Sequence, residues 1–130
     1  MKNKLNAVML IDDNDDDNFF HAHIIRKSSI AENIFIATSA FEALEHLASF
    51  EKAPQLIFLD INMPKMNGFD FLDAYKKMKP ANNDSIVIML TTSLNPVDRE
   101  KAVQNELITD FRTKPLTREA LLEITERYFL

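Results

Sequence analysis

Residues 56–64, LIFLDINMP, carry the pattern that decides the fold. Four consecutive apolar residues end in one carboxylate, that of Asp60, and a turn marked by Pro64 follows at once. An uninterrupted apolar run of this length is typical of a strand that is buried on both faces of a parallel sheet. We therefore expect Asp60 at the carboxyl end of a central strand, in the crevice where open α/β sheets bind ligands.

Four further apolar runs alternate with helical patterns along the chain. The five expected strands span residues 5–11, 33–38, 56–60, 85–90 and 108–112, and the helices between them begin in the acidic run after the first strand and at residues 40, 68, 96 and 118. This alternation predicts an α/β fold, a five-stranded parallel sheet with helices on both faces and right-handed crossovers. In the first helix, Phe20, Ile24 and Ile25 form an apolar stripe, and we expect Phe19 and Phe20 in the core.

Length and composition restrict the class of protein. The chain has 130 residues, of which 46% are hydrophobic, so it can bury the core of one domain. The absence of cysteine excludes disulfides and thiolate metal sites. A net charge of −5 argues against general affinity for nucleic acid, and no apolar segment is long enough to cross a bilayer. We expect one cytoplasmic domain, residues 1–130, that binds neither nucleic acid nor membrane.

Polar side chains follow four of the expected strands, and a parallel sheet brings them to one edge. They are Asp12, Asp13, Asp60, Thr91 and Lys114. Three carboxylates in one crevice repel each other, and Mg²⁺ would remove the conflict because it prefers oxygen ligands. An ammonium and a hydroxyl beside the cation match the charge that develops on a transferring phosphoryl group. Asp60, alone on its strand end, is the better candidate nucleophile, whereas the adjacent acids suit metal binding.

In combination these residues resemble the response regulator receiver domain of two-component signalling, over essentially the whole chain. The motifs are the pair Asp12–Asp13, Asp60 in LDINMP, Gly68 after Asn67, Thr91 after Leu90, and Lys114–Pro115. The resemblance implies a flavodoxin-like sheet of order 2-1-3-4-5, as in the chemotaxis receiver. It also implies a cis peptide bond between Lys114 and Pro115.

The same resemblance implies a function for the site. Asp60 would accept a phosphoryl group from a histidine kinase or a histidine phosphotransfer protein, and Thr91 and Lys114 would contact the phosphoryl oxygens. Phe111 would be the aromatic switch, and a downstream protein would dock on the surface of the fourth helix, fifth strand and fifth helix. The protein would then be a signalling module that phosphorylates and dephosphorylates itself, not an enzyme with outside substrates.

The resemblance also implies how Mg²⁺ would be held. Asp13, Asp60 and the backbone carbonyl of Asn62 would bind the ion, and Asp12 would help through water.

Three positions depart from the usual pattern of the family. Thr92 replaces a small residue and is expected to narrow access to the phosphoryl group. Phe111 replaces a common tyrosine, and Asp110 stands where a glycine or alanine is usual. These differences concern the switching details and not the phosphorylation.

Other functions remain open from the residues themselves. Each site residue alone is explained equally well as a strand end, a helix cap or a solvated charge. Asp13-Asn14-Asp15 fits the signature of a haloacid dehalogenase-like phosphatase, although no acidic pair follows the fourth strand. A flavodoxin-like FMN binder would need a phosphate loop where this chain has carboxylates. Within the receiver family, a phosphorelay intermediate is equally compatible with the sequence.

Overall fold

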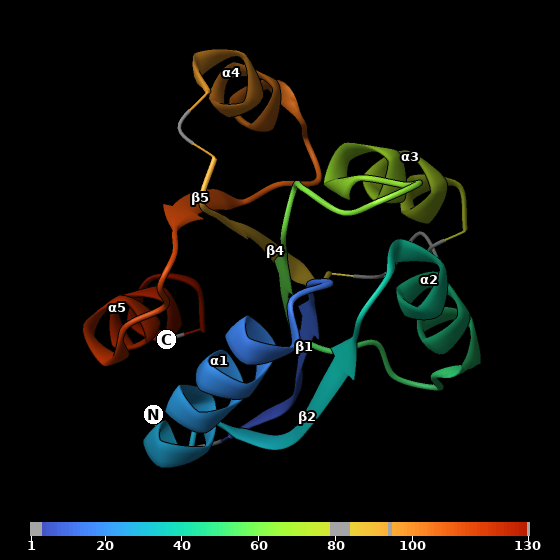
Figure 1. Cartoon of the computed structure of the whole chain (residues 1–130). Coiled ribbons are helices and arrows are strands. Elements are labelled where there is room, and N and C mark those ends of the chain that lie inside the picture. Colours follow the sequence, from blue (N-terminus) through green and yellow to red (C-terminus); the bar gives the residue numbers. More distant parts are fainter. Residues whose placement is uncertain (1–3, 79–83, 94, 130) are drawn as a thin grey trace.

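Five parallel strands form one sheet in the order β2-β1-β3-β4-β5, as expected (Figure 1). The computed structural model describes residues 4–78, 84–93 and 95–129. The strands are β1 (Leu5–Ile11), β2 (Ala31–Ala37), β3 (Leu56–Leu59), β4 (Ile86–Thr91) and β5 (Asp110–Thr113). The helices are α1 (Asp15–Ser28), α2 (Ala40–Ser49), α3 (Gly68–Met78), α4 (Pro96–Gln104) and α5 (Arg118–Phe129).

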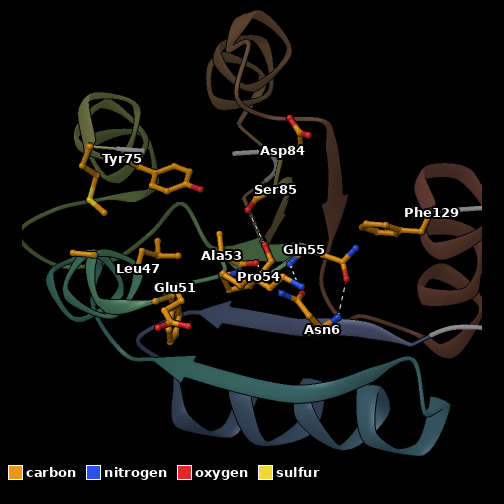
Figure 2. A pocket seen from close by; sticks show the side chains of 14 residues that line it. Asn6, Leu47, Glu51, Ala53, Pro54, Gln55, Tyr75, Asp84, Ser85 and Phe129 are labelled. Atoms are coloured by element: carbon orange, nitrogen blue, oxygen red, sulfur yellow. Dashed lines mark hydrogen bonds between the residues drawn. The ribbon is translucent and has the colours of Figure 1, made fainter. Parts of the chain in front are cut away.

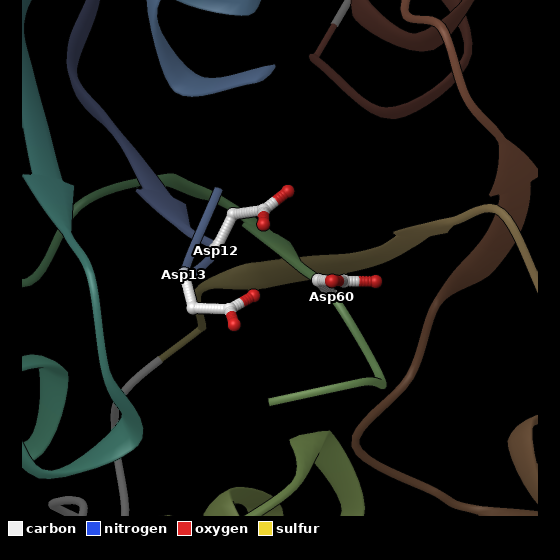
Figure 3. A group of neighbouring side chains, drawn as sticks. All are labelled: Asp12, Asp13 and Asp60. Atoms are coloured by element: carbon white, nitrogen blue, oxygen red, sulfur yellow. The ribbon is translucent and has the colours of Figure 1, made fainter. Parts of the chain in front are cut away.

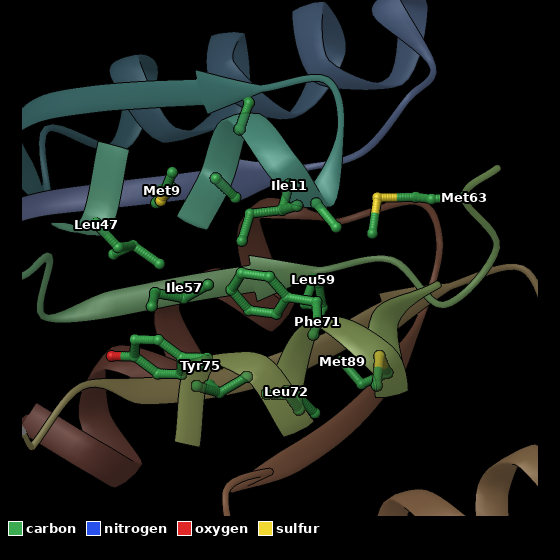
Figure 4. Close-up of a cluster of buried hydrophobic side chains, with 14 of the residues drawn as sticks. Met9, Ile11, Leu47, Ile57, Leu59, Met63, Phe71, Leu72, Tyr75 and Met89 are labelled. Carbon is green, nitrogen blue, oxygen red and sulfur yellow. The ribbon is translucent and has the colours of Figure 1, made fainter. Parts of the chain in front are cut away.

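Helices cover both faces of the sheet, so each central strand is buried on two sides. Ile57 and Leu59 of β3 pack in the cluster formed with α2 and α3 (Figure 4), whereas Leu56 and Phe58 pack in the cluster formed with α1 and α5. All four residues of β3 are buried. This alternation explains why the strand reads as a continuous apolar run.

Asp60 directly follows this buried strand, at the carboxyl edge of the sheet. Its backbone N–H donates to the carbonyl of Ile11 at 3.0 Å, which continues the pairing of β3 with β1. The chain then turns, and the N–H of Gly68 at the start of α3 donates back to the carbonyl of Ile61 at 2.9 Å. The position of Asp60 is therefore fixed by backbone hydrogen bonds on both sides.

The expectation that Phe19 and Phe20 belong to the core was wrong. Phe19 is 74% exposed and Phe20 is 45% exposed. Helix α1 instead buries a stripe of mixed polarity, made of Asn18, His21, Ala22 and Ile25. Asn18 Nδ2 donates to the carbonyl of Asp12 and His21 Nε2 accepts from the N–H of Leu116, whereas Asn18 Oδ1 has no partner among the described residues. These hydrogen bonds offset part of the cost of burying polar groups, so α1 turns a face inward that hydrophobicity alone does not identify.

Four strands differ from their predicted bounds, β3 by one residue at one end, β4 by one residue at each end, and β2 and β5 by more. β2 begins two residues early because its pairing with β1 starts at Ala31 opposite Leu5. β5 begins at Asp110, opposite Ile88, and extends to Thr113 opposite Thr91. Backbone pairing extends β2 to Ala31 and β5 to Thr113, residues that carry no strand pattern of their own. No helix in the described part of the chain is both long and apolar enough to span a membrane.

Candidate functional site

Three carboxylates meet at the carboxyl edge of the sheet, as predicted (Figure 3). Asp12 and Asp13 follow β1, and Asp60 follows the neighbouring β3. Each offers one oxygen, and these oxygens lie within 4.8 Å of one another. Asp12 and Asp60 are buried while Asp13 is exposed, so the cluster is open to solvent on one side. An all-oxygen set of this kind fits a divalent cation such as Mg²⁺.

Asp12 is held by contacts to both of its carboxylate oxygens. Its Oδ1 accepts from the backbone N–H of Asn14 at 3.0 Å, and its Oδ2 lies 2.6 Å from the ammonium of Lys114. The amide group of Asn18 in α1 also donates to the backbone carbonyl of Asp12 at 2.8 Å. The side chain and main chain of Asp12 are therefore both anchored.

Asp60 is less well satisfied than Asp12. Among the described residues its Oδ1 has no hydrogen-bond partner, although the side chain is buried. Burial raises the pKa of Asp60, and the charge of Asp12 adds to this, whereas Thr91, Lys114 and the amide of Asn62 act to lower it. The net effect is a raised pKa. A buried carboxylate in this condition is stabilised by gaining a proton or a cation.

Lys114 brings a positive charge to the carboxylates from the end of β5. Its Nζ lies 2.6 Å from Asp12 Oδ2, 2.8 Å from Asp17 Oδ2 and 3.6 Å from Asp60 Oδ2. Burial acts to lower the pKa of Lys114, but hydrogen bonds to Asp12 and Asp17 and the charge of Asp60 outweigh it, so the pKa is raised. The amine is thus protonated throughout the neutral range.

Thr91 ends β4, and Phe111 lies on the neighbouring β5, which Lys114 directly follows. Thr91 is fully buried, its Oγ1 accepts from the N–H of Ser93 at 3.3 Å, and its carbonyl accepts from the N–H of Lys114 at 2.9 Å. Phe111 of β5 is half-buried, and the guanidinium of Arg99 in α4 lies 5.4 Å from its ring centroid. This distance is typical of a cation–π contact.

Comparison with known proteins identifies the family. The sequence matches the family model of the response regulator receiver domain over residues 8–126. This chain belongs to that family. The receiver is 33% identical over 122 residues to the sensor histidine kinase CheAY of Helicobacter pylori, covering 92% of this chain and 14% of that protein. It is 34% identical over 110 residues to protein-glutamate methylesterase/protein-glutamine glutaminase 3 of Burkholderia thailandensis, covering 83% of this chain and 29% of that protein.

Solved structures agree with the fold of the receiver. A two-component response regulator from Cytophaga hutchinsonii superimposes with a TM-score of 0.86 and 37% identity, covering 96% of this chain and 97% of that one. A response regulator receiver protein from Dyadobacter fermentans gives a TM-score of 0.84 and 29% identity, covering 95% and 97%. The receiver spans less than a third of the two sequence relatives named above, so the similarity to them concerns one part of each.

The receiver brings together the residues that were predicted to meet. Asp12, Asp13 and Asp60 cluster, Lys114 reaches them, and Thr91 ends the strand next to β3. The peptide bond between Lys114 and Pro115 is cis, as the family resemblance implied.

Helix α1 contributes to this site in a way that was not predicted from the sequence. Asp17 binds the ammonium of Lys114, and Asn18 binds the carbonyl of Asp12. His21 is buried, and its Nε2 accepts from the N–H of Leu116 at 3.2 Å. Burial lowers the pKa of His21, which is consistent with an unprotonated Nε2. A spacing of four places Asp17 and His21 on one helix face, and that signal could have identified the pair.

A large cavity of about 720 Å³ lies away from the carboxylates (Figure 2). Its lining includes Asn6, Gln55 and Ser85, which lie at or before the amino ends of β1, β3 and β4. The N–H of Asn6 donates to Gln55 Oε1 at 2.7 Å, and Ser85 Oγ donates to the carbonyl of Pro54 at 2.7 Å. These contacts join the starts of the strands. The cavity therefore lies at the amino edge of the sheet, opposite the edge that carries the carboxylates.

Proposed function

We propose that this receiver accepts a phosphoryl group on Asp60 from a phosphohistidine, carried by a histidine kinase or a histidine phosphotransfer protein. The observation that carries the proposal is the environment of Asp60. Its carboxylate is buried, its Oδ1 has no partner among the described residues, and the Lys114 ammonium lies 3.6 Å from its Oδ2. An oxygen that is free of other bonds is available as a nucleophile, and the nearby cation is available to the incoming anion.

In the proposed reaction a carboxylate oxygen of Asp60 forms a bond to phosphorus. The bond from phosphorus to the histidine nitrogen of the donor breaks, and its electron pair returns to the imidazole. Lys114 and Thr91 would contact the phosphoryl oxygens, Lys114 with a fixed positive charge and Thr91 with a hydroxyl donor. Because only the ionised carboxylate is nucleophilic, Asp60 must be deprotonated before it reacts.

We propose that Asp13, Asp60 and the backbone carbonyl of Asn62 hold Mg²⁺, with Asp12 acting through water. The two oxygens of Asp12 already accept from Asn14 and Lys114, which supports an indirect role for this residue. When bound, the ion would neutralise charge on the carboxylates and on the phosphoryl oxygens.

Phosphorylation is proposed to shift the receiver between two conformations, with Phe111 as the switch residue. Support comes from the position of Phe111, which is half-buried and contacts Arg99 of α4. A downstream protein would dock on the face of α4, β5 and α5, where Val97, Val103 and Leu122 are exposed.

Residues 1–130 are proposed to work as a single receiver domain in the cytoplasm, without enzymatic activity on outside substrates. The Cytophaga hutchinsonii response regulator, of which this chain covers 97%, supports the part of this proposal that concerns a single receiver domain. A relay role, in which Asp60 passes its phosphoryl group to a histidine phosphotransfer protein, is the alternative within the same mechanism.

The test is incubation with acetyl phosphate and Mg²⁺, followed by intact-protein mass spectrometry. The native chain should gain one phosphoryl group, Asp60→Asn should gain none, and Asp13→Asn should require more Mg²⁺. Asp73→Asn, at an exposed position of α3, is the matched control and should behave as the native chain. Normal phosphorylation of Asp60→Asn would refute the assignment of the acceptor.

A further inference from the structure

The Lys114 ammonium is closest to two carboxylates that are not the proposed phosphoryl acceptor. Its Nζ lies 2.6 Å from Asp12 Oδ2 and 2.8 Å from Asp17 Oδ2, but 3.6 Å from Asp60 Oδ2. Asp12 is adjacent to the metal-binding positions, whereas Asp17 lies in the first turn of α1, 97 residues from Lys114. Asp17 thus adds a fourth carboxylate to a site that already contains three.

The structure of α1 keeps Asp17 beside the ammonium. The backbone N–H of Asp17 donates to Oδ1 of the helix cap, Asn14, at 3.0 Å. The same helix is bound to the site by Asn18, through the carbonyl of Asp12, and by His21, through the N–H of Leu116. Because these anchors join α1 to Asp12, which contacts Lys114, and to Leu116, two residues after Lys114, the contact is built into the docking of α1.

The ion pair between Asp17 and Lys114 is partly shielded from solvent. The Lys114 side chain is 9% exposed, while the Asp17 side chain is 36% exposed and lies at the rim. An exposed ion pair would be weakened by solvent, but this ammonium is largely removed from it. The raised pKa of Lys114, to which the Asp17 hydrogen bond contributes, agrees with a substantial interaction.

We propose that Asp17 is a positioning residue that holds the Lys114 ammonium away from Asp60 and thereby weakens binding of a phosphoryl group there. The inference rests on the proposed function. An ammonium shares one charge among its acceptors, so a second nearby carboxylate competes with the phosphoryl oxygens for it. The negative charge of Asp17 also repels the incoming anion directly. Both effects act in the same direction.

Beryllofluoride, a phosphoryl mimic that binds aspartate without covalent transfer, provides the test. It is titrated into the full chain at saturating Mg²⁺, and binding is followed through the amide NMR shift of Thr91. The Asp17→Asn variant should bind the mimic roughly threefold to tenfold more tightly than the native chain. Asp17→Glu, which retains the carboxylate, should restore affinity close to the native value.

Asp16→Asn is the matched control. Asp16 lies in the same first turn of α1 and is exposed, so its substitution removes the same charge and the same helix-dipole interaction. Its affinity for beryllofluoride should stay near that of the native chain. Thermal unfolding of both variants provides a second readout, because a purely structural role for Asp17 would lower stability without tightening the binding of the mimic.

The outcomes separate this inference from the proposed function. Binding of beryllofluoride by Asp17→Asn that is equal to or weaker than native binding would overturn the role of Asp17, as would an equal gain in affinity in Asp16→Asn. In either case, binding by the native chain would still support Asp60 as the phosphorylation site. Failure of the native chain to bind beryllofluoride and to accept a phosphoryl group would overturn both.

Discussion

The backbone carbonyl oxygen of Asp60 lies 2.5 Å from the point that a Cβ atom would occupy on Gly68. The same Cβ would lie 3.1 Å from the Cα of Ile61. Both neighbours are backbone atoms, so a side-chain rotation cannot relieve the contact. Gly68 is the single glycine of the chain, and its lack of a side chain is what lets α3 begin against the turn that follows Asp60.

Gly68→Ala should therefore destabilise the fold by about 1–3 kcal/mol, because α3 or the Asp60 turn must move to admit the methyl group. Urea denaturation measures the loss. Asp73→Ala, which adds an alanine at an exposed position of the same helix, should change stability little. A Gly68→Ala variant as stable as the native chain would show that this turn adapts freely.

The raised pKa of Asp60 predicts a pH-dependent penalty on stability. Consider a carboxyl group whose pKa is higher in the folded than in the unfolded state. It does not reduce the free energy of unfolding below the unfolded pKa, but the reduction grows as pH rises through the folded pKa. Asp60→Asn removes that penalty, so at pH 7 and without Mg²⁺ it should be more stable than the native chain. The gain should vanish near pH 3.

Chemical denaturation at several pH values measures this difference. Adding Mg²⁺ should stabilise the native chain more than Asp60→Asn, because a ligand that binds only the folded state raises its stability. Asp73→Asn is again the matched control. A gain that is independent of pH would contradict the assignment of the penalty to ionised Asp60.

His21 links α1 to the residue that follows the Lys114–Pro115 bond. Replacing it with leucine would leave the N–H of Leu116 without its acceptor and should cost about 1–3 kcal/mol. The same change at His23, exposed on the same helix, should have little effect. Equal losses at both positions, measured by thermal unfolding, would show that the hydrogen bond is not the cause.

The lowered pKa of His21 also predicts a dependence on acid. Burial is the main cause of the lowered pKa, and the positive charge of Lys114 also lowers it. The negative charges of Asp17 and Asp12 act to raise it. The folded chain resists protonation of this ring, whereas the unfolded chain takes up a proton below about pH 6.5. Stability should therefore fall as pH drops below that value, by up to about 1.4 kcal/mol per pH unit. His21→Gln should lack this component, which unfolding curves between pH 7 and pH 5 can test.

Ser29 ends α1 in the left-handed conformation, with φ 53° and ψ 34°, and its N–H donates to the carbonyl of Arg26 at 3.1 Å. A side chain is unfavourable there, and Ser29 is exposed. Ser29→Gly should therefore stabilise the receiver by about 0.5–1 kcal/mol. Lys27→Gly, inside the helix two residues earlier, should destabilise it by a similar amount. Calorimetric unfolding that shows the same sign for both would contradict this explanation.

Sequence alone determined the sheet and the acids at its edge. Apolar runs such as residues 56–59 identify buried strands because a strand covered on both faces must be apolar throughout. Parallel strands share a carboxyl edge, which places the acids after β1 and β3 on that edge. The edge follows from local pattern and a general rule of topology, whereas the adjacency of β1 and β3 followed from the motifs shared with the receiver family.

Tertiary structure alone decided which face of α1 turns inward and what it holds. Phe19 and Phe20 have the hydrophobicity of core residues, yet Asn18 and His21 are the buried ones. Asn18 donates to the nearby carbonyl of Asp12, and His21 accepts from the N–H of Leu116, 95 residues along the chain. The contact of Asp17 with Lys114 joins residues 97 positions apart. Hydrogen bonds and ion pairs require atoms within about 3 to 4 Å of each other, and only the folded backbone sets those distances.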